Sequence, residues 1–293
     1  MNIIFHPDIM EYYFQCFGAM SFNSKQLLVS NIFNNTSSKI VVSKNYIEFL
    51  ETYFSGTHSD LFKLFVKSIV GNGQKSESVI TPAFKNIENE LANLHTASSG
   101  DITIILSKSP IRHMGCNLDC VGNFDLFDSN KTHHLIVNLC ARNEVSYRHF
   151  DFQNDSEIKS FFDSMFLIPK RIVGAFIFGR YCNFSGHNLF ETLKRRSPKV
   201  RVYTNNPKRY PQEIDHKIKE AKSLFGKTCN IFSTSQAALI HERKLLVDKL
   251  IIEVDDDFDK LSVSNQTWKI DISYSDSLFK SILSKTPKFK LEK

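Results

Sequence analysis

The sequence lacks the dense set of cysteines that marks a small disulfide-stabilised protein. Its 293 residues contain six cysteines, scattered at positions 16, 116, 120, 140, 182 and 229. Small secreted domains held together by disulfides carry cysteine at a much higher density, so this class of fold is excluded. We interpret most of these cysteines as buried thiols of a protein in the reducing cytoplasm.

Long apolar runs are absent as well. No stretch of the sequence approaches ~18 consecutive apolar residues, the length needed for a membrane-spanning helix, so we expect no transmembrane segment. The N-terminal sequence MNIIFHPDIMEYY has no basic segment followed by a long apolar run, so we expect no signal peptide. No repeat of fixed period and no long low-complexity tract is visible.

The composition that remains is that of a folded chain with an uneven charge distribution. Hydrophobic residues make up 42% of the sequence and include 26 Phe, which excludes wholesale disorder. The net charge is +6, but residues 194–227 alone contain eleven Lys or Arg and three acidic residues. Such a basic segment favours contact with phosphate groups, the alternative being a solvated helical face.

Short apolar runs alternate with helical patterns along the chain, which predicts an α/β fold. We predict two domains, an N-terminal α/β domain of residues 1–160 without an assigned role and a second α/β domain of residues 161–293. In the first, strands are predicted at residues 3–5, 40–42, 102–106 and 135–139, and helices at 9–17, 46–54, 62–69 and 84–94. In the second, strands are predicted at residues 172–178, 200–204, 230–233, 238–247, 250–254 and 268–273, and helices at 185–196, 211–224 and 277–284.

The most informative motif has the form His-x-Arg-x-x-x-x-Asp and consists of His241, Arg243 and Asp248. Because alternate side chains of a strand share one face, we expect His241 and Arg243 to point the same way. A nucleophile and a phosphate-binding cation would then lie side by side, and Asp248, just past the strand, would orient the site or balance its charge. The alternative is a sheet histidine with satisfied hydrogen bonds beside a salt-bridged arginine.

This motif resembles the signature of the phospholipase D superfamily, His-x-Lys-x-x-x-x-Asp, with Arg243 in the place of the lysine. Residues 172–284 resemble more closely the phospholipase-D-like C-terminal module found after microtubule-interacting-and-trafficking (MIT) domains. The similar strings are IHERKLLVDKLIIEVDDDFDKL, WKIDISY and FIFGRYCN followed by SGHN. The resemblance implies an α/β sandwich in which His241 attacks phosphorus to form a phosphohistidine and a second histidine protonates the leaving group. It implies no metal and no other cofactor, and it allows for members that bind without catalysis.

The arginine in the lysine position changes the chemistry of the motif. A planar guanidinium binds phosphate through two parallel hydrogen bonds, so anion binding survives the change, whereas transition-state geometry is altered. The sequence contains one such motif, and a catalytic version needs a second histidine from a homodimer partner or from elsewhere in the chain. His187 and His216 are candidates, although neither lies in a matching motif. Because symmetric pairing is common, we expect a homodimer.

Four further residues are candidates for substrate binding, namely Tyr181, Asn183, Lys208 and Arg209. They follow predicted strand ends, where α/β sheets usually place ligands. The segment of residues 205–210 combines amides, two cations and an aromatic ring, a combination suited to following a polynucleotide backbone and stacking a base. An ordinary exposed turn is the alternative.

Two groups of residues have metal-ligand chemistry without convincing spacing. The acidic cluster Asp255, Asp256, Asp257 and Asp259 directly follows a predicted strand and lacks the spacing of a calcium loop, so we interpret it as an exposed turn. A possible zinc set has ligands of suitable type but loose flanks; it consists of His113, Cys116, Cys120 and either His133 or His134. We predict no metal site.

Asp8 follows the first predicted strand, as an acidic residue does in toxin nucleases of the PIN type, which gather several acids around a divalent metal. The other acids of this half show no recognisable spacing, and we favour a role for Asp8 as the cap of the next helix.

The sequence therefore predicts a metal-independent phosphodiesterase acting on nucleic acid. The preference for nucleic acid over lipid rests on the basic segment, and a bacterial defence or toxin role is implied by the resemblance alone. The alternative is a non-catalytic module that binds phosphorylated lipid or a protein partner.

Overall fold

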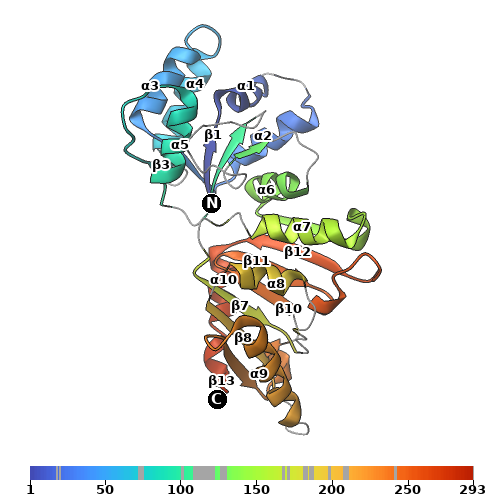
Figure 1. The fold of residues 1–293 in the computed structure, drawn as a ribbon. Helices are drawn as coiled ribbons and strands as arrows, with labels where there is room; N and C mark the ends of the chain where they lie inside the picture. Colours follow the sequence, from blue (N-terminus) through green and yellow to red (C-terminus); the bar gives the residue numbers. More distant parts are fainter. Residues whose placement is uncertain are drawn as a thin grey trace. The chain divides into compact units, whose positions relative to one another are not determined.

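The computed structural model describes residues 1–17, 19, 21–71, 76–99, 102–107, 123–125, 131–166, 169, 172–180, 184, 188–196, 199–206, 211–240 and 243–292. The chain divides into two compact units. The first consists of Met1–Asn143 and Leu167–Lys170, and the second consists of Glu144–Phe166 and Arg171–Lys293. Each unit has its own sheet (Figure 1). The division falls earlier than the predicted boundary between residues 160 and 161, because β6 (Glu144–Arg148) pairs with a strand of the second sheet.

The first unit is built on a five-stranded parallel sheet in the order β3-β2-β1-β4-β5. Its strands are β1 (Asn2–Phe5), β2 (Lys39–Val42), β3 (Ser76–Ser78), β4 (Thr103–Ser107) and β5 (Asn123–Asp125). Its helices are α1 (Pro7–Gln15), α2 (Ser24–Asn34), α3 (Lys44–Tyr53), α4 (Ser59–Gly71), α5 (Ile87–Ala97) and α6 (Lys131–Arg142). Parallel sheets are covered on both faces, and Figure 1 shows α1, α2 and α6 on one side of β1 and α3, α4 and α5 on the other.

Two sequence-based predictions for this unit are wrong. Residues 135–139, predicted as a strand, lie within α6, where Leu135, Ile136 and Leu139 are buried. A short apolar run does not by itself distinguish a buried strand from a buried helix face. Asp8 does not cap α1 either, because the cap is His6, whose ring accepts a hydrogen bond from the Asp8 amide.

The second unit contains an eight-stranded sheet in the order β13-β9-β8-β7-β10-β11-β12-β6. Besides β6, its strands are β7 (Gly174–Phe178), β8 (Lys199–Asn205), β9 (Asn230–Thr234), β10 (Arg243–Val247), β11 (Leu250–Val254), β12 (Lys269–Tyr274) and β13 (Lys290–Leu291). The strands β7, β8 and β9 are parallel, and β10 runs antiparallel to β7. The antiparallel strands β11, β12 and β6 continue the sheet from β10.

Helices cover both faces of this sheet. They are α7 (Asp155–Met165), α8 (Asn188–Arg195), α9 (Pro211–Phe225) and α10 (Asp276–Leu283). On the α10 face, Phe178, Tyr203 and Phe232 form a stacked row across β7, β8 and β9, with ring centroids 4.6 and 5.0 Å apart. The alternate residues Ile177 and Val202 point to the opposite face, which α8 and α9 cover (Figure 1).

One predicted strand of the second unit is shorter than expected. Residues 238–247 were expected to form a single strand, but they include the 3₁₀ helix η2 (Ala237–Ile240) and then β10, which begins at Arg243. Ile240 is buried in the cluster beneath α10, beside Tyr203 and Ile282. The 3₁₀ turn therefore directs this apolar side chain into the core. None of the helices that the structure describes has the length and apolar content needed to cross a membrane.

Candidate functional site

The carboxyl ends of the parallel strands β7, β8 and β9 meet the amino end of β10 at one edge of the second sheet. Phe178, the last residue of β7, is opposite Tyr203 of β8 on one side and Lys244 of β10 on the other. Because β10 and β7 are antiparallel, Arg243, which precedes Lys244, lies next to the chain that follows Phe178. Ligands of α/β sheets usually bind outside the carboxyl ends of the strands, so we take this edge as the candidate site.

Buried polar side chains line the sheet just inside this edge. Thr204 and Asn205 at the end of β8, Thr234 at the end of β9, and Lys217 in α9 are all buried. The Lys217 ammonium donates hydrogen bonds to the Arg180 carbonyl (2.8 Å) and to Thr204 Oγ1 (3.2 Å). Burial of a charge is costly unless it is hydrogen-bonded. Lys217 therefore links the ends of β7 and β8 and places a positive charge at the edge.

Arg243 is held in a fixed orientation by the acidic turn that follows β11. Its Nε donates to Asp257 Oδ1 (3.0 Å) and its Nη1 donates to the Asp255 carbonyl (3.2 Å). The two ion-paired side chains are 25% and 23% exposed, so we assign the pair about 1 kcal/mol of stabilisation after allowing for solvent screening. The salt-bridged arginine of the alternative interpretation is thus present, and a phosphate bound at Arg243 would share its guanidinium with Asp257.

Asp248 lies at the other end of β10. It begins the two-residue turn that joins β10 to β11, and its φ of 52° is in the left-handed region that Asp and Asn tolerate better than most residues. At about 3.3 Å per residue, its Cα lies roughly 16 Å along the strand from that of Arg243. The structure therefore does not bring Asp248 to the edge at which Arg243 lies.

The remaining predicted site residues lie outside the described part of the chain. They are His241, Tyr181, Asn183, Lys208 and Arg209, together with His187 and the zinc candidates His113, Cys116 and Cys120. His216 is described and is ion-paired with Glu220 at 3.3 Å. Among the described residues, no group of three or more His, Cys, Asp and Glu is arranged to hold a metal ion.

The acidic cluster after β11 is used for internal hydrogen bonds. Asp255 Oδ1 accepts from the Lys269 amide (2.6 Å), and Asp256 Oδ1 accepts from the Asp257 amide (2.7 Å). Asp257 binds Arg243 as described above. These contacts agree with the interpretation of the cluster as a turn. The turn also contacts the candidate site, through the hydrogen bond from Arg243 to Asp257.

Sequence analysis missed Lys217 as a residue of this edge. Ile214, Lys217 and Ala221 recur at the spacing of one helix face, and all three are buried. A lysine within an otherwise apolar stripe is the signal that distinguishes it from the exposed lysines of the same basic segment. This pattern predicts that Lys217 is buried, but its hydrogen bonds to Arg180 and Thr204 are known only from the structure.

Comparison with known proteins gives structural likenesses only. No protein-family model and no curated protein sequence matches the chain. Nuc from Salmonella typhimurium, a phospholipase D family member, is 9% identical, and the match covers 51% of this chain and 97% of that chain at a TM-score of 0.37. The archaeal chromatin protein TrmBL2, whose structure shows a mode of DNA binding, is 10% identical over 52% of this chain and 54% of its own, at a TM-score of 0.32.

Polyphosphate kinase from Porphyromonas gingivalis is similar to 54% of this chain over 28% of its own length, with 9% identity and a TM-score of 0.33. A phospholipase D family structure is thus among the chains similar to this mixed α/β fold. At these TM-scores no conclusion about function follows from the likenesses. The closer relation to the MIT-associated module stays a prediction.

Proposed function

We propose that the second unit is a phospholipase-D-like phosphodiesterase that cleaves nucleic acid without a metal ion. The observation that supports this proposal is the position of Arg243 at the amino end of β10, next to the carboxyl end of β7. Lys217 adds a second positive charge at the end of β7 and β8. Two cations at the carboxyl edge of parallel strands are suited to holding a phosphate group.

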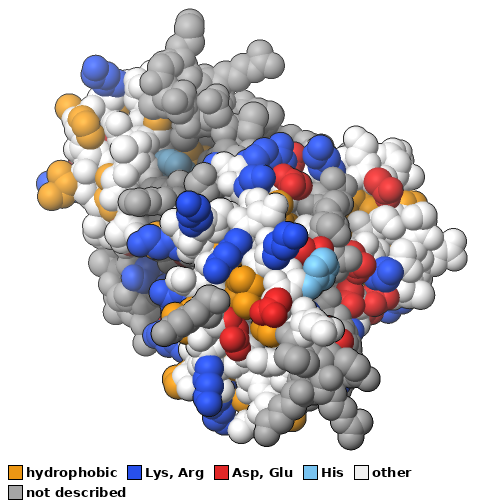
Figure 2. Space-filling model, turned by 60° about the horizontal axis from the view of Figure 1, so that its bottom comes forward, with side chains coloured by type: hydrophobic (Ala, Val, Ile, Leu, Met, Phe, Trp, Pro, Cys, Tyr) orange, Lys and Arg blue, Asp and Glu red, His pale blue; other side chains and the backbone are white. Residues whose placement is uncertain are grey.

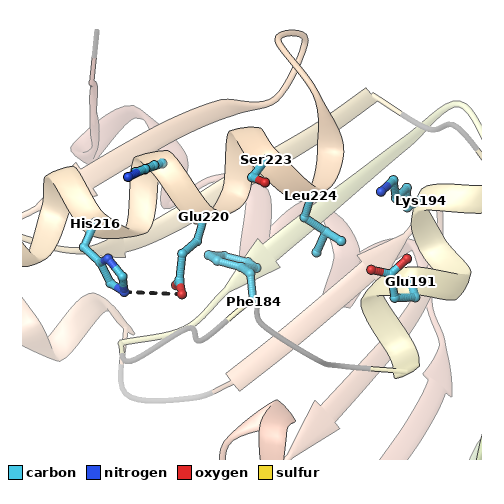
Figure 3. A pocket seen from close by; sticks show the side chains of 8 residues that line it. Phe184, Glu191, Lys194, His216, Glu220, Ser223 and Leu224 are labelled. Atoms are coloured by element: carbon cyan, nitrogen blue, oxygen red, sulfur yellow. Dashed lines mark ion pairs between the residues drawn. The ribbon is translucent and has the colours of Figure 1, made fainter.

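In the proposed reaction, His241 attacks the phosphorus atom and Arg243 holds the non-bridging oxygens. The bond from phosphorus to the leaving oxygen breaks, and that oxygen takes a proton from a second histidine. Water then hydrolyses the phosphohistidine and restores His241. The second histidine would come from a homodimer partner or from His187 of the same chain, since His216 faces the space between α8 and α9, where it pairs with Glu220 (Figure 3).

One observation favours a second candidate function, the binding of a phosphorylated lipid or protein without catalysis. Arg243 already donates through Nε and Nη1 to the turn after β11. A guanidinium fixed in this way can hold an anion, but it follows the changing charge of a transition state less readily than a flexible lysine. A role in bacterial defence and a cytoplasmic location belong to the nuclease proposal and rest on the sequence resemblance alone.

The proposal is tested by incubating labelled single- and double-stranded DNA and RNA with the full chain in EDTA. Wild type is compared with His241→Ala and with His134→Ala, which changes an exposed histidine of the first unit. We expect cleavage by wild type and by His134→Ala, and none by His241→Ala. Cleavage that persists in His241→Ala would refute the nucleophile, and absence of cleavage in all three proteins would favour the binding module.

A further inference from the structure

The strand β6 forms one outer edge of the eight-stranded sheet of the second unit. It pairs with β12 on one side, and no strand that the structure describes pairs with its other side. Val145 and Tyr147 lie on the face that α7 covers, where the Tyr147 ring packs against this helix. The other face carries the exposed residues Glu144, Ser146 and Arg148. The strand therefore presents a row of polar side chains along an open edge of the sheet.

The backbone groups of alternate residues in β6 are directed away from the sheet. The Asp255 amide donates to the Lys269 carbonyl at 3.2 Å, so residues 269, 271 and 273 of β12 hydrogen-bond to β11. Residues 270 and 272 then hydrogen-bond to β6, and their partners are residues 147 and 145. The backbone groups of residues 144, 146 and 148 are therefore at the open edge. The Arg148 amide agrees with this direction, because it donates to Asp151 Oδ2 at 2.7 Å instead of to β12.

Glu144 and Arg148 are the charged residues of β6. Within the part of the chain that the structure describes, neither has an ion-pair partner, and Arg148 is directly opposite Lys269, a like charge that is itself paired with Asp271 at 2.9 Å. Glu144 and Arg148 cannot pair within one chain, because four residues of a strand span about 13 Å. Figure 2 shows that acidic and basic side chains are mixed over the visible face of the molecule. The order of charges along this strand, and not the net charge, is therefore what can specify a partner.

We propose that β6 pairs antiparallel with β6 of a second copy of this chain, about a two-fold axis at Ser146. In this register Glu144 is opposite Arg148 of the partner subunit, and by symmetry the same ion pair forms a second time. Val145 is opposite Tyr147 of the partner subunit, on the face that α7 covers. Opposite charges and a β-branched residue facing an aromatic ring are both favourable cross-strand pairs. Each Arg148 also gains an acidic neighbour on the side away from Lys269.

The backbone groups at the open edge support the same register. The amide and carbonyl of Ser146 would form two hydrogen bonds with those of Ser146 of the partner subunit, and the Glu144 amide would donate to the carbonyl of Arg148 of the partner subunit. The Arg148 amide stays bonded to Asp151. An axis at residue 145 or 147 would place the charged side chains opposite serine or outside the paired segment. An extended segment of another protein would need a matching order of charges, whereas a second copy supplies it.

Pairing through β6 would join the two sheets and keep the two candidate sites apart. Arg243 lies in β10, three strand spacings from β6. Three spacings in each copy and one between them, at about 4.8 Å each, separate the two Arg243 residues by about 34 Å. A partner bound in this way would not bring a histidine to the phosphate at Arg243. The inference does not rest on the proposed function, and association of the chain can be measured without any cleavage.

The test is the mass of the full chain in solution, measured by sedimentation equilibrium over a range of protein concentrations. Wild type should associate to twice its mass of 33.7 kDa. Glu144→Arg and Arg148→Glu each place like charges opposite each other twice by symmetry, and each should raise the dimer dissociation constant about tenfold or more. The controls Glu213→Arg and Lys285→Glu make the same charge changes at exposed positions outside β6, and they should alter the constant by less than about twofold.

Two rescue experiments separate strand pairing from a general loss of stability. A mixture of Glu144→Arg and Arg148→Glu chains should form a heterodimer, because each altered charge of one chain then meets an opposite charge of the other. The double variant Glu144→Arg/Arg148→Glu exchanges the two charges, and its dissociation constant should return to within about threefold of wild type. If the single variants weaken the dimer and neither rescue restores it, the proposed register is wrong.

Ser146→Pro removes the two hydrogen bonds at the proposed axis. Because the Ser146 amide points away from β12, proline spares the hydrogen bonds within the sheet, and the melting temperature should stay close to that of Ser146→Ala. Ser146→Ala loses the hydroxyl bonded to Asp271 but keeps the amide, so it is the control and should still dimerise. We expect Ser146→Pro to be monomeric where wild type is dimeric. A wild type that is monomeric at every concentration would overturn the proposal, and a dimer that persists in Ser146→Pro and in both charge reversals would assign association to another surface.

Discussion

Replacing Asp257 by Asn should strengthen anion binding at Arg243. The substitution keeps the shape of the side chain and an oxygen that can accept from Arg243 Nε, but it removes the negative charge that lies 3.0 Å from this nitrogen. The change therefore tests whether Asp257 competes with a phosphate for the guanidinium or merely orients it. In the structure the pair is 25% and 23% exposed, which limits its strength.

The size of the effect follows from that partial exposure. A pair of this kind is worth about 1 kcal/mol once solvent screening is included. If a phosphate must displace or share this interaction, its loss should raise phosphate affinity about fivefold, since about 1.4 kcal/mol corresponds to a factor of ten. The free energy of unfolding should fall by no more than about 1 kcal/mol.

The assay is a titration with inorganic phosphate followed by ³¹P NMR, for wild type, Asp257→Asn and Asp259→Asn. Asp259 belongs to the same turn and is ion-paired with Lys260 at 3.7 Å, so it controls for the removal of a charge near the site. Arg243→Ala establishes how much of the affinity depends on the guanidinium. A lower affinity in Asp257→Asn would refute the reasoning and show that Asp257 orients Arg243 for its ligand. An equal rise in both variants would show a general charge effect.

Two further predictions concern the stability of the second unit. Trp268→Phe should lower the free energy of unfolding by about 1–3 kcal/mol, because the buried indole Nε1 donates to the Ser262 carbonyl at 2.6 Å. Urea denaturation followed by circular dichroism measures this change, and an unchanged midpoint would contradict the prediction. Burial raises the pKa of the Cys229 thiol to about 11, above that of an unfolded chain. Since the unfolded thiol loses its proton first, stability should fall as pH rises from about 9 toward 11, and Cys229→Ala should show a smaller fall between pH 7 and 10. An identical pH dependence in both proteins would count against this cause.

The strands of the second unit were largely predictable because most of them are buried. The predicted ranges 200–204, 230–233 and 250–254 coincide closely with β8, β9 and β11. Buried strands between turn residues leave an apolar run that can be read without the fold. The edge strand β6 leaves no such run, since its sequence EVSYR is largely exposed and its strand character depends on pairing with β12.

The division between the two units falls earlier than the predicted boundary for the same reason. A strand that is stabilised mainly by backbone pairing to a distant segment carries little local signal. Ser146 of β6 is opposite Asp271 of β12, more than a hundred residues later in the chain, and the two side chains are hydrogen-bonded. Without that pairing, residues 144–148 look like the end of the first half.

The relation between Arg243 and the acidic turn can be predicted from the sequence once the turn between β10 and β11 is placed. A two-residue turn at residues 248–249 sets Val247 opposite Leu250 and therefore Arg243 opposite Val254. The residues that follow Val254 must then pass beside Arg243, and they are the acids Asp255, Asp256 and Asp257. The same register excludes Asp248 from the site, because a hairpin turn and the open ends of its strands lie at opposite ends of the pair.

This register also bears on the choice between catalyst and binder. The hairpin places Asp257 beside Arg243, the cation that the proposed reaction needs. The charge balance at the edge therefore depends on Asp257 as much as on Arg243. An ion pair of about 1 kcal/mol is weak enough for a phosphate diester to compete with it, yet strong enough to orient the guanidinium in its absence. The arrangement is therefore compatible with a site in which substrate replaces Asp257 as the partner of Arg243. Comparing the effect of Asp257→Asn on phosphate affinity with its effect on cleavage distinguishes such an exchange from a salt bridge that stays closed.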